Sequence, residues 1–312
     1  MCCRVYTEGN TPRDVANHAV VRILEDIFNQ HKGSEINRVV LILNHLGVEE
    51  KNIQELTLDF SKSKKVMDFS VDFSAIETLT VLKLRCKTHG VLSINAQNHK
   101  KFKKLVLYSM PNRLQIILDA PTLECYKYEG LVRIVDFSKV DALKEAKLHY
   151  IQNNNWRYYD SSNMVLANMG AYTGVHVLST TNIFLEAFKE RYVEGEMRSP
   201  TFNFWNLKEF HILLKTPNIC TLYHIAEFLK QGPKVEKVLI DIKKFTFEPG
   251  MLWIIHQKSD MEGKNYEFNS IKEATIDGYK NHWHELDIET LRKELADSIM
   301  QGWIPYEADF QI

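Results

Sequence analysis

A strand-like pattern of apolar residues recurs along the chain at long intervals. Its clearest copies are LKEAKLHY at 143–150, LKEFHILL at 207–214 and IKEATIDG at 271–278, where Lys-Glu precedes alternating apolar and polar positions. Alternation with a period of two buries one face of a strand, whereas a helix needs apolar residues every three or four positions. Each copy therefore predicts a short strand with one buried face.

The same template, apolar–x–x–apolar–x–apolar, fits further segments. Between Leu79 and Leu143 successive copies are separated by 23, 21 and 20 residues. Leucine-rich repeats have a period of about 20–29 residues and the same strand core. Longer separations after Leu143 indicate inserted helices or loops. Copies begin at Ile36, Ile53, Leu79, Phe102, Leu123, Leu143, Leu207, Val235 and Ile271, with a weaker candidate at Gly174.

Parallel stacking of such strands joins their buried sides into one continuous core. An antiparallel sandwich also uses alternating strands, but tight Asn-Gly or Asp-Gly turns are missing between the candidate strands. We therefore predict an α/β fold, a leucine-rich-repeat solenoid. It resembles the ribonuclease-inhibitor horseshoe, with a parallel sheet on the concave side and irregular helices and loops on the convex side.

Helix and loop signals divide this single predicted domain, residues 1–312, into parts. Capping and periodicity predict helices at 11–33, 221–231 and about 288–302. Clusters of Asn, Asp and Ser in segment 151–173 predict a surface loop. The predicted parts are an N-terminal helix at 11–33, first repeats at 34–150, an irregular insertion at 151–206 and C-terminal repeats at 207–312.

Composition argues against several classes of protein. A formal net charge of −1 gives no bulk attraction to nucleic acid or to an anionic membrane. No apolar run approaches the roughly 20 residues of a membrane span. The five cysteines are irregularly spaced and form no C-x-x-C pair, so neither a disulfide framework nor a zinc cluster is predicted. We expect a cytoplasmic or nuclear protein that binds neither nucleic acid nor membrane.

Catalytic and cofactor motifs give no support for an enzyme. The sequence contains no G-x-S-x-G, H-E-x-x-H or phosphate-binding glycine loop. His282, His284 and Glu285 lie close together, but a third metal ligand at a defined spacing is missing. We therefore predict a non-catalytic binding module without metal or cofactor.

Outward strand positions predict where a partner binds. The residue between the last two apolar template positions points away from the core, and so does the residue two positions later. These two lanes are Thr57, Lys83, Val106, Lys127, Lys147 and His211, and Asp59, Arg85, Tyr108, Glu129 and His149. Lysine is a common solvent-facing strand residue, so chance accounts for the pattern equally well. The alternative is a basic and aromatic partner-binding patch made of Lys83, Arg85, Tyr108, Lys127, Lys147 and His149.

Several segments resemble the leucine-rich-repeat region of the plant F-box/LRR family. They are ILEDIFNQHKGSEINRVVLIL at 23–43, NIQELTLDF at 52–60, APTLECYKYEG at 120–130 and IAEFLKQGPKVEKVLIDI at 225–242. The segment from 271 to 299 is similar to the closing strand, loop and helix of members with an FBD-like end. The likeness spans most of the chain.

The resemblance implies a role in protein recognition. Family members usually begin with an F-box, which opens on Leu-Pro and docks on the Skp-type adaptor of a cullin ubiquitin ligase. Residues 1–15, MCCRVYTEGNTPRDV, show no such opening. We expect the substrate-recognition part of a ligase adaptor, which binds its protein partner on the concave face and needs an F-box supplied upstream to bind the Skp-type adaptor. The alternative is a ligase-independent binding protein or decoy that competes for the same partner.

Overall fold

The structure is a computed structural model, and its described residues form two compact units, Met1–Ala171 and Tyr172–Ile312. The prediction of one domain over residues 1–312 stays a prediction. The described residues are 35–42, 54–59, 65–72, 78–85, 90–110, 115–151, 158–188, 191–193, 196–198, 202–214, 219–242 and 268–277.

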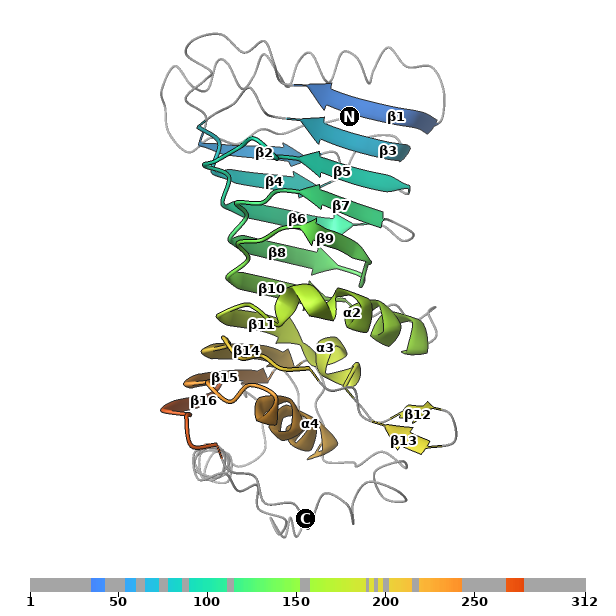
Figure 1. Ribbon diagram of the computed structural model, residues 1–312. Helices are drawn as coiled ribbons and strands as arrows, with labels where there is room; N and C mark the ends of the chain where they lie inside the picture. The colour runs from blue at the N-terminus through green and yellow to red at the C-terminus, as the bar shows by residue number, and fades with distance from the viewer. Residues whose placement is uncertain are drawn as a thin grey trace. The chain divides into compact units, whose positions relative to one another are not determined.

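In the first unit, successive strands alternate between two parallel sheets (Figure 1). One sheet has the order β1-β3-β5-β7-β9, and the even-numbered strands pair in the order β10-β8-β6-β4-β2. The odd-numbered strands are β1 (Glu35–Ile42), β3 (Lys65–Asp72), β5 (Val91–Asn95), β7 (Gln115–Asp119) and β9 (Val135–Lys139). The even-numbered strands are β2 (Glu55–Asp59), β4 (Val81–Arg85), β6 (Lys104–Met110), β8 (Cys125–Gly130) and β10 (Glu145–Tyr150).

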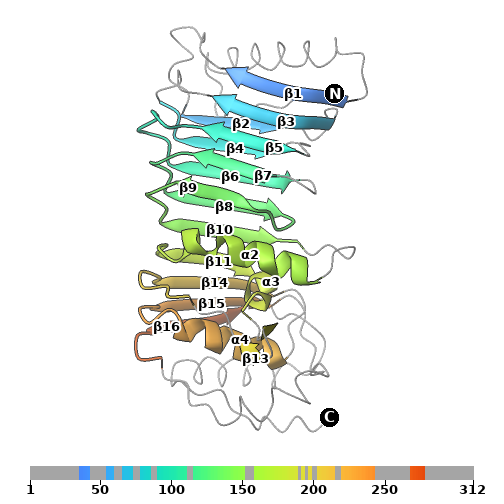
Figure 2. The ribbon, with the colours of Figure 1, turned by 45° about the vertical axis from the view of Figure 1, so that its right-hand side comes forward.

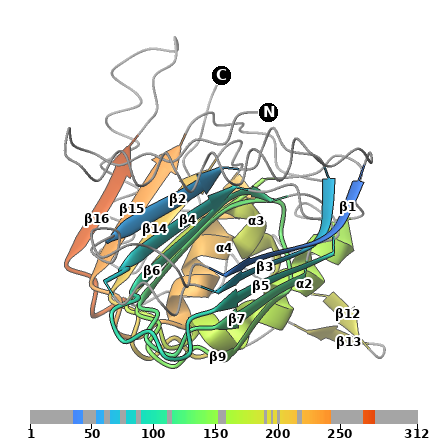
Figure 3. The same ribbon diagram turned by 90° about the horizontal axis from the view of Figure 1, so that it is seen from above.

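The second sheet corrects the prediction of helices and loops opposite the template strands. Figure 3 shows the odd-numbered strands facing the even-numbered ones. The copy of the template that begins at Ile36 forms β1 and pairs with β3, so it belongs to this second sheet. The segments VLSIN at 91–95 and QIILD at 115–119 alternate in burial, which makes them strands although they lack the leucine spacing of the template.

The core of the first unit lies between its two sheets. Leu56, Leu82, Leu105 and Leu148 are at most 4% exposed, which confirms the template register in these strands. Tyr126 of β8 meets Phe137 of β9 edge to face, with 5.2 Å between ring centroids. Facing residues from the second sheet are also buried, namely Phe69, Val71, Leu92, Ile94, Ile116, Leu118 and Val135.

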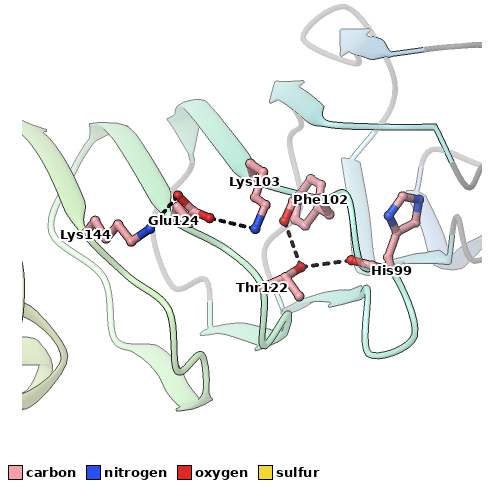
Figure 4. A network of polar contacts seen from close by, with 6 residues as sticks. All are labelled: His99, Phe102, Lys103, Thr122, Glu124 and Lys144. Atoms are coloured by element: carbon pink, nitrogen blue, oxygen red, sulfur yellow. Dashed lines mark hydrogen bonds and ion pairs between the residues drawn. The ribbon is translucent and has the colours of Figure 1, made fainter.

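A hydrogen-bonded turn leads into several template strands. The N–H of Phe102 donates to the carbonyl of His99, and the N–H of Leu123 donates to that of Ala120. The Thr122 hydroxyl lies 2.8 Å from the carbonyl oxygens of both His99 and Phe102, to which it donates (Figure 4). The fourth residue of each turn is the first apolar residue of the template, so the turn fixes where the strand begins.

The lysine of the recurring Lys-Glu pair belongs to a ladder that joins one repeat to the next. The Lys103 carbonyl accepts hydrogen bonds from two successive N–H groups of the next repeat, those of Glu124 and Cys125. At this position the Glu124 carboxylate pairs with Lys103 at 2.6 Å and with Lys144 at 3.0 Å (Figure 4). Both lysines lower the pKa of Glu124. In the second unit Lys272 likewise pairs with Glu236 at 2.8 Å. Charge therefore alternates from repeat to repeat.

Helix α2 (Tyr158–Tyr172) closes the second sheet of the first unit, so the prediction of a surface loop over 151–173 is wrong for these fifteen residues, and residues 152–157 lie outside the described residues. The Asn168 amide donates to the Arg133 carbonyl at 2.5 Å and accepts from the Val135 N–H at 2.9 Å. Asn168 is buried. Its side chain thus satisfies backbone groups at edge strand β9 that another strand would otherwise pair. The turn-forming residues at 160–163 lie within the helix.

The second unit is built on the parallel strands β11 (Val177–Thr181), β14 (Glu209–Leu214), β15 (Lys237–Ile242) and β16 (Glu273–Asp277), in that order. Helices α3 (Asn182–Glu186) and α4 (Ile219–Lys230) lie side by side against the sheet (Figures 1 and 2). Helix α4 confirms the predicted helix 221–231. The short strands β12 (Arg191–Val193) and β13 (Glu196–Arg198) form an antiparallel pair.

Strand β11 confirms the weak copy of the template but corrects its register by one residue. The buried positions are Val175, Leu178 and Thr180, so the pattern begins at Val175 rather than Gly174. Because strand side chains alternate, this slip exchanges the buried and outward positions. A cluster of phenylalanines packs beneath the sheet, with ring centroids of Phe210 and Phe228 4.5 Å apart.

Two predicted helices, 11–33 and about 288–302, lie outside the described residues, as does the chain beyond β16. Among the helices that the structure describes, none has the length and hydropathy needed to cross a membrane.

Candidate partner-binding surface

The even-numbered strands of the first unit present a continuous outward surface, here called the outer face. It consists of the residues of β2, β4, β6, β8 and β10 that alternate with the buried ones. In register, Thr57 lies beside Lys83, Lys83 beside Val106, and Val106 beside Lys127, which lies beside Lys147. A second lane runs parallel to it: Asp59, Arg85, Tyr108, Glu129 and His149.

The structure thus brings all six residues of the predicted patch onto one face. Lys83 and Arg85 come from β4, Tyr108 from β6 and Lys127 from β8. Lys147 and His149 come from β10. Neighbouring strands lie about 4.8 Å apart, so Lys83 and Lys127, two strands apart, are separated by about 10 Å at the backbone.

Two of the predicted lysines are engaged by glutamates of the outer face. Lys83 pairs with Glu55 of β2, and Lys147 pairs with Glu145 at 2.6 Å. Both pairs are partly exposed, so each contributes little to stability. They do reduce the positive charge that the two lysines offer to a ligand. The sequence lanes omitted both glutamates because they occupy the first strand position, whereas the lanes follow the third and fifth positions.

Tyr108 lies among cations near the middle of the outer face. The Lys127 ammonium group is 5.8 Å from the centroid of the Tyr108 ring, within the range of a cation–π contact. Arg85 flanks Tyr108 in register on β4 and is exposed, and Glu129 flanks it on β8. The arrangement offers an aromatic ring with positive charge on two sides.

The positive charge is concentrated on the three central strands. There, β4, β6 and β8 carry four basic outward residues against one acidic residue, Glu129. Lys104, which the sequence lanes did not include, is one of the four and is exposed. Its signal was present in the double lysine of FKKLVL at 102–107. The basic residues are Lys83, Arg85, Lys104 and Lys127.

Val106 does not have the exposure expected of an outward residue, since it is only 1% exposed. Its register neighbours on either side are Lys83 and Lys127. Long lysine stems cover apolar surface while their ammonium groups stay in water. We attribute the burial of Val106 to the side chains of these two neighbours. In this lane charged groups therefore lie above a buried apolar side chain.

Cys125 and Glu145 lie beside each other on the outer face, where the thiol is a poor nucleophile. Burial, with a hydrogen bond to Glu145, raises the pKa of the Cys125 thiol to about 11. Burial also acts to raise the pKa of Glu145, but hydrogen bonds from Lys147 and Cys125 outweigh it, and the pKa of Glu145 is lowered. A protonated thiol beside a charged carboxylate is a poor nucleophile.

His211, the last residue of the first predicted lane, lies in the second unit. It stands on β14 between Ser179 of β11 and Leu239 of β15. Its Nε2 atom lies 3.5 Å from the Glu209 carboxylate. Its register neighbours are thus uncharged, unlike the lysines of the lane in the first unit.

The side chains of the outer face are of kinds that can contact an acidic ligand. Within the described ranges, no three His, Cys, Asp or Glu side chains gather as metal ligands would. The residues His282, His284 and Glu285 lie outside them. Partly exposed ammonium groups and an aromatic ring can form ion pairs and stacking contacts with an acidic ligand.

Comparison with known proteins identifies the family. No family model matches the chain, and no solved structure matches it. An FBD-associated F-box protein of Arabidopsis thaliana is 45% identical over an alignment that covers 86% of this chain and 72% of that protein. A putative FBD-associated F-box protein of the same plant is 44% identical, covering 86% of this chain and 74% of the relative. The chain therefore belongs to the plant family of FBD-associated F-box proteins.

Proposed function

We propose that this chain recognises a protein partner for a ubiquitin ligase and that the partner binds on the outer face of the first unit. The observation that carries the proposal is the in-register set of cations around Tyr108, on a chain whose relatives are named F-box proteins. The proposed role is that of an adaptor without catalytic activity of its own.

The repeat geometry supports the finer proposal of a leucine-rich-repeat solenoid. A turn, a polar ladder position and a short parallel strand follow one another in several successive repeats. In such arrays each repeat contacts only its neighbours, which leaves an extended sheet surface available for a partner. We propose that the outer face is the concave face of this class, with a second sheet in place of the convex helices in the first unit.

An acidic segment is the ligand that the outer face fits best. Four cations on the central strands attract negative charge, which raises the rate of association and makes binding sensitive to salt. Tyr108 supplies a rigid amphipathic ring of the kind that anchors interfaces. We propose that acidic side chains of the partner pair with Lys83, Arg85 and Lys127 while an apolar side chain packs on Tyr108.

The test is an affinity capture from plant extract that compares matched charge variants. Wild type and a Lys83→Glu plus Lys127→Glu variant are immobilised, and captured proteins are quantified by mass spectrometry. The control is Lys100→Glu plus Lys101→Glu, which makes the same change in charge at exposed positions of a turn. A protein retained by wild type and control but lost from the outer-face variant supports the proposal. Equal retention by all three chains contradicts it.

A second candidate function is a ligase-independent binding protein or decoy. The two functions differ in whether the Skp-type adaptor joins the complex. We expect the chain as printed not to bind purified adaptor, and a fusion with an F-box ahead of Thr11 to bind it. The fusion should then bring adaptor and partner into one complex, measured by size-exclusion chromatography. Partner and adaptor that exclude each other on the fusion would favour the decoy.

A further inference from the structure

A solvent-exposed tryptophan lies on a turn of the second unit. Trp205 is 57% exposed, whereas Phe204 and Leu207, on either side of it in the same turn, are fully buried. The Leu207 N–H donates to the Phe204 carbonyl at 3.2 Å, which closes the turn that leads into β14. The turn is therefore anchored in the core at both ends while its indole stays in water.

The turn is also held from the neighbouring repeat. The Phe204 N–H donates to the main-chain carbonyl of Gln231 at 2.8 Å, and the Phe202 N–H donates to the Gln231 side-chain oxygen at 2.9 Å. Gly232 follows, where an added Cβ would come within 2.9 Å of the Val235 side chain. The indole is thus presented on a backbone held in place before any ligand binds. Such preorganisation lowers the entropic cost of binding.

The fold itself does not call for a large apolar side chain at this position. Among the described residues, five other turns that lead into template strands are closed by the same hydrogen bond between their first and fourth residues. Their second residues are small, polar or proline, as is usual for exposed turn positions. Packing therefore does not explain Trp205. The five turns are His99–Phe102, Ala120–Leu123, Tyr172–Val175, Gly232–Val235 and Phe268–Ile271, with Lys100, Pro121, Thr173, Pro233 and Asn269 in second place.

Two lysines lie near Trp205 along the same row of turns. Lys208 follows it by three residues, and Lys234 lies in the adjacent turn, one repeat on. Both are exposed and neither forms an ion pair within the described part of the chain, but the charge of Lys208, after that of Lys272, helps to lower the pKa of Glu236 in the next repeat. By contrast Lys272 of the same ladder pairs with Glu236 at 2.8 Å. Lys234 is thus available for a carboxylate of a ligand, and Lys208 can add a second contact although it shares its charge with Glu236.

We propose that Trp205, Lys208 and Lys234 form a second docking site, which binds an acidic segment of a partner protein that also carries an apolar side chain. The apolar group packs on the indole, and flanking carboxylates pair with the two ammonium groups. Tryptophan is among the residues most enriched at the energetic centres of interfaces. The site lies wholly within the second unit and does not depend on the outer face of the first unit.

Peptide selection tests the site without a known partner. Random dodecapeptides displayed on phage are selected on the full chain and then depleted on a Trp205→Ala variant. We expect the surviving peptides to contain Asp or Glu beside a Leu, Phe or Trp. A representative peptide should bind wild type about tenfold or more tightly than Trp205→Ala. The Lys208→Glu plus Lys234→Glu variant should lose binding to a similar extent.

Controls separate docking from misfolding and from other occupants. Lys100→Glu plus Lys101→Glu, at the equivalent turn of the first unit, should leave peptide binding unchanged. Circular dichroism of all variants should match wild type. Peptides that bind independently of Trp205, or that are basic or uncharged, overturn the proposal. So does self-association of the wild-type chain in sedimentation that Trp205→Ala abolishes, because the occupant would then be a second copy.

Discussion

Replacing Asn168 by Ala should open the edge of the second sheet in the first unit. The change removes a hydrogen-bond donor from the Arg133 carbonyl and an acceptor from the Val135 N–H, both of which face a buried side chain. Leaving a buried polar group without its partner costs about 1–3 kcal/mol. Because small shifts of the surrounding structure can restore part of the lost hydrogen bonding, we expect the two groups together to lower the local stability of β9 by about 2–4 kcal/mol.

Hydrogen–deuterium exchange of the peptide that covers residues 132–140 measures this loss directly. A local loss of about 2–4 kcal/mol corresponds to exchange that is roughly 30- to 1,000-fold faster. The control is Asn163→Ala, which removes an exposed amide from the same helix and should change stability by less than about 0.5 kcal/mol. If both variants exchange at the wild-type rate at Val135, then Asn168 does not hold the edge of β9 and the reasoning is refuted.

Three further perturbations test the core, the ladder and the thiol. Leu82→Ala or Leu105→Ala should each lower the free energy of unfolding by about 2–5 kcal/mol because both side chains are fully buried, whereas Lys83→Ala should change it little. Urea denaturation measures these changes. Leucine variants as stable as wild type would mean that the predicted register is wrong. Lys103 and Lys144 lower the pKa of Glu124, so the ion pairs stabilise the fold above the ordinary pKa of a glutamate, and this stabilisation is lost as pH falls through the lowered pKa. On acidification the melting temperature of a Glu124→Gln variant should therefore fall by less than that of wild type. Equal falls in melting temperature would contradict the ladder. With a pKa of about 11, Cys125 should be about 0.1% thiolate at about pH 8. It should therefore react with iodoacetamide far more slowly than a small-molecule thiol of pKa about 8.5, which peptide mapping measures. Rapid alkylation in the folded chain would contradict the burial of Cys125.

The strands of one sheet followed from the sequence because their chemistry is local. Each template strand needs two or three buried apolar residues at fixed spacing, and Leu82, Leu105 and Leu148 meet that need without reference to the rest of the fold. The outward lanes then followed from alternation alone. The Gly174 copy failed by one residue because Val175, Val177 and Leu178 allow two registers, and only pairing with β14 selects between them.

The second sheet and helix α2 could not be predicted in the same way because neighbours determine them. Short segments such as QIILD at 115–119 are strands because they pair with neighbours far along the chain, in this case with β5. Helix α2 contains turn-forming residues, and its buried Asn168 is explained only by the backbone groups of β9. The burial of Val106 likewise depends on Lys83 and Lys127, which lie on the strands to either side of it. A local sequence pattern does not contain residues so far apart in the chain.

Site-specific photocrosslinking tests most directly the claim that the outer face holds the partner. A photoreactive amino acid replaces Lys127 on β8 in one chain and Lys139 on β9, in the other sheet, in a second chain. With a partner identified by affinity capture, the account predicts a crosslink from position 127 and none from position 139. A crosslink from position 139 but not from position 127 would place the partner on the other sheet and contradict the account.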